Sequence, residues 1–152
     1  MSEIISITEN EIIQWGHVQG KRVTKRAVRV CFDGIPPAQP RQNRKTRFNE
    51  DGSGNRAMRY LDWRATLRDE LFYTMYQKGI EKFPAVRLQL KIEMWFLTEA
   101  ERRKCDLKNQ LATIEDCLND ILIVDDKWID RFEDTERLIG PHRQTVFEIR
   151  EL

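Results

Sequence analysis

Carboxylates are concentrated in one part of the sequence, between residues 105 and 128. At about 100° per residue in an α-helix, five polar side chains fall within a stripe roughly 80° wide: Asp106, Asn109, Thr113, Asp116 and Asp120. The leucine and isoleucine side chains of this segment lie on the other side, a pattern typical of an amphipathic helix. Oxygen-bearing side chains of this kind are the ligands that hard divalent cations prefer.

A second acidic feature, the pair Asp125-Asp126, follows a short apolar run at residues 121–124. If the chain turns back along the helix there, these acids meet those at the helix start. Carboxylates brought together repel one another unless a cation lies among them, and oxygen ligands favour Mg²⁺ above all. This arrangement favours metal-assisted hydrolysis of a phosphodiester, in which the cation lowers the pKa of an attacking water and neutralises phosphate charge. Two plainer interpretations remain open: a solvated helix face in a protein–protein adaptor, and a turn capped by the two aspartates.

The overall charge hides a strong segregation. The chain has 152 residues, 40% hydrophobic and 34% charged, with a formal charge of +1, which predicts one globular domain. Residues 21–68 contain 13 basic and 4 acidic side chains, whereas residues 105–136 contain 10 acidic and 3 basic ones. A basic half beside an acidic half is suited to binding a polyanion next to a cluster of carboxylates.

Several classes of protein are excluded by what the sequence lacks. It has no apolar run of the roughly 20 residues that cross a bilayer, and its first residues carry no basic segment of a signal peptide. Three cysteines without CxxC spacing indicate reduced thiols and a cytoplasmic location. Two distant histidines argue against a zinc site, and neither a P-loop nor a nucleophile elbow is present.

The expected elements give an α+β domain in which a small mixed sheet packs with two main helices. Thr8 and Glu11 have capping-box spacing, so residues 4–15 are predicted to form a short appended element. A long polar and basic loop is expected at residues 41–55, and a charged, exposed connection at residues 99–104. The remaining pattern predicts strands at residues 23–32, 86–96, 128–136 and 145–152, and helices at residues 58–78 and 107–121.

Three short motifs resemble the RusA family of Holliday-junction resolvases: Arg103-Lys-Cys-Asp106-Leu-Lys-Asn109, Ile114-Glu-Asp116-Cys-Leu and Val124-Asp125-Asp126-Lys-Trp. That family's pattern is an aspartate, an Asp-Asn pair, a lysine, a helix with another aspartate before a leucine, and a double aspartate. The part of the chain before these motifs also agrees with the family's order: the segment Ile35-Pro36-Pro37, then the basic loop, then the helix near Tyr60. The resemblance predicts a RusA-like endonuclease domain at residues 23–152 and an N-terminal extension at residues 1–22.

What the resemblance implies is a homodimer that binds four-way DNA junctions and nicks two strands symmetrically in DNA recombination and repair. The cofactor would be Mg²⁺, with Mn²⁺ as a substitute. Asp106 matches the family's first metal-binding aspartate, Asp126 matches the last, and Asp125 is its neighbour. Asn109 and Asp116 match the family's asparagine and helix aspartate, as supporting residues.

Two positions depart from the family pattern. Lys108 stands where the family has its second aspartate, and Ala112 stands where it has its lysine. Lys108 or Lys104 could reach the phosphate from another direction, which makes Lys108 a supporting candidate. The alternative function is a catalytically impaired protein that binds junctions without cleaving them.

The basic half is expected to follow the phosphate backbone, giving affinity without reading sequence. The predicted DNA-binding residues are Arg41, Arg44, Lys45, Arg47, Arg56, Arg59 and Lys104, and Arg64 and Arg68 belong to the same basic group.

Overall fold

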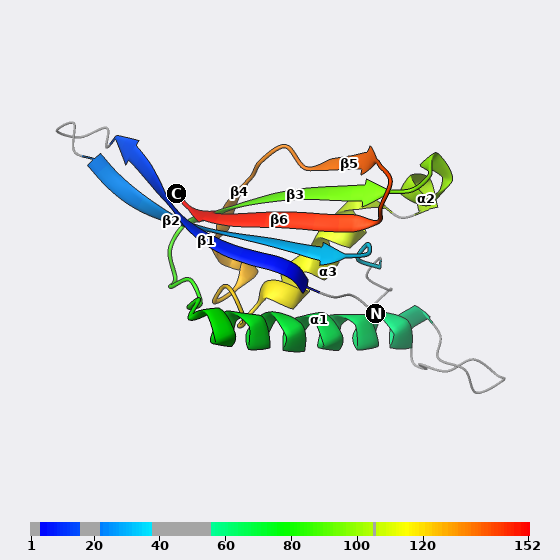
Figure 1. The fold of residues 1–152 in the computed structure, drawn as a ribbon, viewed down its shortest axis with the longest axis horizontal. Helices are drawn as coiled ribbons and strands as arrows, with labels where there is room; N and C mark the ends of the chain where they lie inside the picture. The colour runs from blue at the N-terminus through cyan, green and yellow to red at the C-terminus, as the bar shows by residue number, and fades with distance from the viewer. Residues whose placement is uncertain (1–3, 16–21, 38–55, 105) are drawn as a thin grey trace.

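The computed structural model describes residues 4–15, 22–37, 56–104 and 106–152 (Figure 1). Its elements, in chain order, are β1 (Ile4–Trp15), β2 (Arg22–Asp33), α1 (Arg56–Lys78), β3 (Leu88–Phe96), α2 (Glu99–Lys104), α3 (Leu107–Leu118), the short 3₁₀ helix η1 (Asp126–Trp128), β4 (Ile129–Phe132), β5 (Glu136–Ile139) and β6 (Gln144–Glu151).

One mixed sheet of six strands forms the centre of the molecule. Its order is β1-β2-β6-β3-β4, and β5 also pairs with β3. The neighbours from β1 to β3 are antiparallel, whereas β4 and β5 run parallel to β3. The expected α+β class with a small mixed sheet is therefore confirmed.

The core lies between one face of this sheet and the two main helices. Side chains at every second position of β3, from Leu88 to Phe96, are buried, as the alternation in the sequence predicts. Leu67 and Leu71 of α1 and Ile114 of α3 belong to the same buried cluster. Burying this apolar face fixes α3, and hence its polar residues, against the sheet.

Gly79 ends α1 where the sequence predicts a stop. It adopts a φ of +68°, a backbone conformation that glycine reaches without steric cost. The N–H of Ile80 donates to the carbonyl of Met75 over 2.9 Å, and Ile80 is itself buried. This six-to-one bond followed by an apolar contact is a Schellman motif, which satisfies carbonyls at the helix end.

The first segment differs from the capped element that Thr8 and Glu11 suggest. Residues 4–15 form β1, which pairs with β2 from Ile4 to Trp15 and buries Ile7 opposite Val30. Burial of alternate residues against an existing strand outweighs the local capping spacing, which alone stabilises a helix end by only about 1 kcal/mol.

Three other boundaries also differ from the sequence-based expectation. The expected connection at residues 99–104 is the helix α2, whose first turn is capped by a bond from the Glu101 N–H to the Thr98 hydroxyl (3.2 Å). The single strand expected at residues 128–136 is two short strands, β4 and β5. Helix α3 ends at Leu118 rather than Ile121, because Asp120 turns the backbone to a φ of 63°.

None of the helices within the described ranges is long and apolar enough to cross a membrane.

Candidate active site

Asp106 lies immediately before α3 and caps it. Its carboxylate accepts a hydrogen bond of 2.9 Å from the backbone N–H of Lys108, which is a normal N-cap contact. The side chains of Asp106, Lys108 and Asn109 are exposed. The helix N-terminus also carries partial positive charge, so the Asp106 carboxylate is held at a position where anions are favoured.

The polar stripe predicted on α3 does not face solvent along its length. Thr113 is fully buried and donates to the carbonyl of Pro37 over 2.6 Å, and Gln110 donates to the carbonyl of Pro36 over 3.3 Å. The two prolines cannot donate backbone hydrogen bonds, but their carbonyls accept. The residues that lead into the basic loop are thereby fixed against the middle of α3.

Asp116 faces α1, where it has hydrogen-bonding and cationic neighbours. The buried Tyr60 hydroxyl donates to the Asp116 carboxylate, and burial together with this bond raises the pKa of Tyr60 well above its ordinary value. The Arg64 guanidinium lies 5.5 Å from the centre of the Tyr60 ring. These contacts make Asp116 part of the seam between the two helices.

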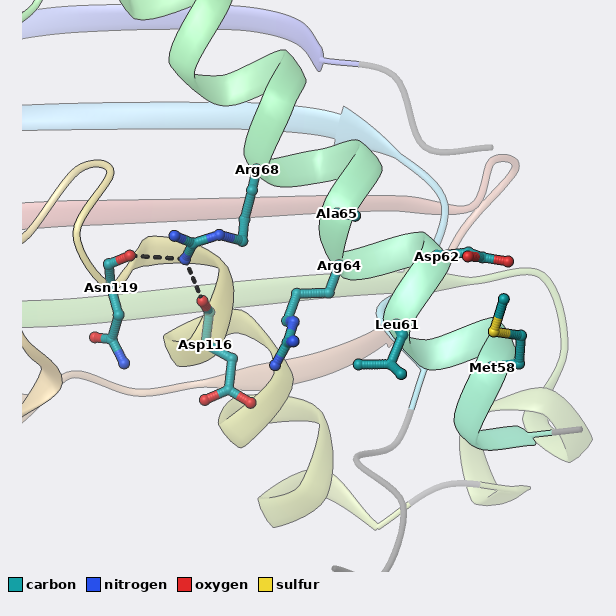
Figure 2. Close-up of a pocket in the computed structure, with 8 residues that line it drawn as sticks. All are labelled: Met58, Leu61, Asp62, Arg64, Ala65, Arg68, Asp116 and Asn119. Atoms are coloured by element: carbon teal, nitrogen blue, oxygen red, sulfur yellow. Dashed lines mark hydrogen bonds between the residues drawn. The ribbon is translucent and has the colours of Figure 1, made fainter. Parts of the chain in front are cut away.

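A groove of about 740 Å³ lies along this seam (Figure 2). Its lining includes Arg64, Arg68, Asp116 and Asn119, and Arg64 points across it towards α3. Arg68 donates to the backbone carbonyls of Asp116 (2.8 Å) and Asn119 (2.7 Å). Because the last carbonyls of a helix lack internal partners, Arg68 acts as the cap of α3.

Asp125 and Asp126 come back to the last turn of α3. Asp125 caps η1 by accepting a 3.0 Å bond from the backbone N–H of Lys127. Asp126 forms side-chain hydrogen bonds with Asp125, Glu115 and Asn119. The chain therefore turns back along the helix as expected, but to its C-terminal part. The carboxylate contact with Glu115 is one that the sequence analysis missed.

Protonation is shared unequally among these acids. Burial, followed by the hydrogen bond to Asp126 and the nearby negative charges, raises the pKa of Glu115 to about 7. The hydrogen bond with Asp125 and partial burial raise the pKa of Asp126. The backbone N–H of Lys127 lowers the pKa of Asp125. Near neutral pH the group holds a proton that isolated carboxylates would have lost.

Asp106 does not join this group. Glu115 follows it by nine positions, about 13 Å along the helix axis at 1.5 Å per residue. Across the described ranges, no three or more His, Cys, Asp or Glu side chains are grouped so that they could hold a metal ion. The joint action of Asp106 with Asp125 and Asp126 remains a prediction.

The donor set nevertheless suits a hard cation in its chemistry. The Asp126 and Glu115 carboxylates repel unless a proton or cation lies between them, and Mg²⁺ commonly uses only one or two carboxylates. Beside them, the buried Oδ1 of Asn119 has no hydrogen-bond partner in the part of the chain that the structure describes. An unsatisfied buried oxygen is costly, and a cation or its water would satisfy it.

Both departures from the family pattern lie on the stripe that leads to this group. Lys108, Ala112, Glu115 and Asn119 recur at steps of four, three and four, which places them on one side of α3. Lys108 and Glu115 are two helical turns apart and differ by only about 20° around the axis. The positively charged Lys108 therefore lies at the start of this stripe, and the Glu115 carboxylate lies near its end.

The predicted DNA-binding residues are only partly described. Arg41, Arg44, Lys45 and Arg47 lie outside the described residues, and the structure describes the backbone of Arg56 but not its side chain. Arg59 on α1 and Lys104 at the end of α2 are exposed. The described residues that flank the basic loop, Pro37 and Tyr60, both contact α3.

The fold is a mixed α+β domain in which an acidic helix lies beside the flanks of a basic loop. The family model for endodeoxyribonuclease RusA matches residues 35–147, so the chain belongs to the RusA family of nucleases, which resolve Holliday junctions. No curated protein shows significant similarity to the chain.

Proposed function

We propose that this protein is a cytoplasmic, Mg²⁺-dependent and structure-selective endonuclease that resolves Holliday junctions in recombination and repair. It acts as a homodimer and makes paired, symmetric nicks, since a two-fold dimer suits a nearly two-fold substrate. The observation that carries the proposal is the convergence of Asp126 and Glu115 beside the helix to which both flanks of the basic segment are attached.

Each group has a task in this reaction. The basic segment, with Arg59 and Lys104, holds the phosphate backbone. Asp126 and Asp125 would hold the cation; when bound, Mg²⁺ (or Mn²⁺) supplies an activated water and neutralises phosphate charge. Asp106 is the further oxygen donor that the family resemblance assigns, at the opposite end of α3 from this group. Asp116 and Asn109 support the helix that carries these donors, and Lys108 contacts the substrate phosphate.

Nicking of a synthetic four-way junction in Mg²⁺ tests the proposal directly. The native chain should give paired nicks, and Asp106→Asn should lose them while still binding the junction. Exposed Asp120, whose partner is Lys82, provides the control, because Asp120→Asn removes one exposed carboxylate beyond the opposite end of the same helix. Equal loss in both variants would remove Asp106 from the site.

The alternative function is a junction-binding protein with little or no cleavage, which Lys108 and Ala112 favour. In that case the native chain binds four-way DNA tightly but makes no nicks in Mg²⁺ or Mn²⁺. The double variant Lys108→Asp/Ala112→Lys should then gain nicking activity. Mg²⁺ binding is a second way to separate the two functions. For the enzyme, Mg²⁺ should raise the melting temperature of the native chain, and this rise should be absent in Asp126→Asn if Asp126 holds the cation.

A further inference from the structure

The paired strands β1 and β2 extend beyond the rest of the sheet. β6 pairs with β2 only from Ala27 to Asp33, whereas β1 continues to pair with β2 as far as Trp15 opposite Arg22. Figure 1 shows this two-stranded part running past the end of β6. We call it the ribbon arm and define it as residues 11–15 and 22–26. At about 3.3 Å per residue it is roughly 17 Å long.

The base of the ribbon arm is firmly attached. Arg26 pairs with Glu9 at 2.8 Å, lies 4.2 Å above the Phe83 ring and bonds to the Glu81 carbonyl. Its backbone N–H donates to Glu151 of β6 over 3.1 Å. These contacts fix the direction in which the arm leaves the domain, so the arm reaches a defined place outside it.

The position of the arm in the chain separates it from the nuclease domain. The family match begins at residue 35, after both strands of the arm. An isolated two-stranded ribbon is only marginally stable in water, so a ribbon held away from the core gains stability from a binding partner.

The charge of the arm indicates which partner that is. Residues 11–26 contain four basic side chains (Lys21, Arg22, Lys25 and Arg26) and a single acidic one, Glu11. Arg26 is used at the base, and Arg22 and Lys25 are at positions of β2 further out along the arm. A basic two-stranded ribbon matches a duplex both in charge and in width, because the major groove admits such a ribbon.

We propose that the ribbon arm binds duplex DNA beside the branch point, through phosphates and without reading sequence. The inference rests on the proposed function, since the nuclease site supplies the DNA. It extends that function by giving the first two strands of the chain a role in binding the flanking duplex. The arm thereby increases the length of DNA that the protein contacts.

The test compares two double variants of the full chain that lose the same charge. Arg22→Gln/Lys25→Gln changes the arm, and Lys91→Gln/Arg131→Gln changes exposed residues of β3 and β4. Binding is measured against salt on four-way junctions with arms of about one and about three helical turns, roughly 10 and 30 base pairs. The arm variant should lose the preference for long arms, and its salt slope should fall by about two.

Further measurements keep failure of the arm and failure of the nuclease distinct. Glu11→Gln, which removes the acidic residue of the arm, should bind long-armed junctions more tightly. Cleavage of fully bound junctions should be unchanged in all arm variants.

Equal binding by the two double variants would overturn the arm proposal alone. A native chain that binds no DNA would remove the proposed function as well. Loss of the dimer in light scattering, with DNA binding retained, would make the arm a contact between copies and reject the proposal.

Discussion

Glu115 and Asp116 are neighbours in sequence, yet they face opposite electrostatic environments. Asp116 accepts from Tyr60 and has Arg64 close by, so its charge is compensated. Glu115 meets another carboxylate, Asp126, and its pKa rises to about 7. One residue step turns the side chain by about 100° around α3, which is enough to exchange a donor-rich seam for an acid-rich surface.

The difference separates a region that stabilises the fold from the region that we propose for catalysis. The seam of Tyr60, Arg68 and Asp116 joins α1 to α3 with its polar groups paired, as buried structural networks require. The acid group of Glu115, Asp125 and Asp126 holds its charges together at a cost, which a bound cation would relieve. Unfavourable charge arrangements of this kind cluster at functional sites.

The largest effect expected from this comparison is on cleavage. Asp126→Asn should lower the rate of junction nicking by roughly 100-fold or more, since even residues behind metal ligands typically cost 10–100-fold. Asp116→Asn should leave the rate nearly unchanged and lower the thermal stability instead. Single-turnover nicking and thermal melting of both variants provide the measurements. If Asp116→Asn lost as much cleavage as Asp126→Asn, the division into seam and acid group would be wrong.

The second effect is on stability and belongs to the seam. Arg68→Ala leaves the carbonyls of Asp116 and Asn119 without their partner, which should cost about 3 kcal/mol and lower the melting temperature by about 5–10 °C. Tyr60→Phe should cost about 1 kcal/mol. Exposed Arg59 on the same helix is the control, and Arg59→Ala should melt close to the native chain. Native-like melting of Arg68→Ala would show that water caps the helix equally well.

The third effect depends on pH and belongs to the acid group. The pKa of Glu115 rises on folding from 4.5 to about 7, so the folded protein binds more protons between these values. Stability is therefore lost as the pH rises through this window. Glu115→Gln should remove that loss and be more stable than the native chain at pH 8 by about 1–2 kcal/mol, a value reduced for solvent screening.

Urea unfolding at pH 4 and pH 8 measures this third effect. The gain from Glu115→Gln should disappear at pH 4, where the native carboxyl is protonated in both states. Glu136→Gln, on exposed β5, serves as the control and should show no such dependence. A gain of the same size at both pH values would indicate a packing effect and contradict the charge explanation.

The sequence predicts well those elements whose periodicity agrees with their burial. The alternation of β3 and the end of α1 at Gly79 are examples, because at each place the local pattern agrees with the burial or the backbone conformation that the fold requires. Strand β1 could not be predicted in this way. Its local spacing resembles a helix start, and only the pairing with β2 makes it a strand.

For the candidate site, local pattern and resemblance named Asp106, Asp125 and Asp126 but did not indicate Glu115. The N-cap role of Asp106 is a local property, whereas the contact between Glu115 and Asp126 depends on how the chain folds back after Leu118. A helical stripe drawn through Lys108 and Ala112 would have pointed to Glu115 as well. The stripe drawn through Thr113 and Asp116 instead faces the rest of the fold, because Thr113 is buried against Pro37 and Asp116 accepts from Tyr60 of α1.

The smallest effect is expected at Asp120, which lies between the two regions and tests how far the acid group extends. Its backbone adopts a φ of 63°, which glycine tolerates better, and its exposed carboxylate pairs with Lys82 at 3.0 Å. Asp120→Gly gains about 0.5–1 kcal/mol from the backbone and loses a similar amount from the ion pair. The melting temperature should therefore stay within about 2 °C of the native value. Nicking should also be unchanged, because the carboxylate of Asp120 is already compensated by Lys82. A fall in cleavage comparable to that of Asp126→Asn would mean that all acids at this helix end act together, and the boundary between compensated and uncompensated carboxylates would have to be moved.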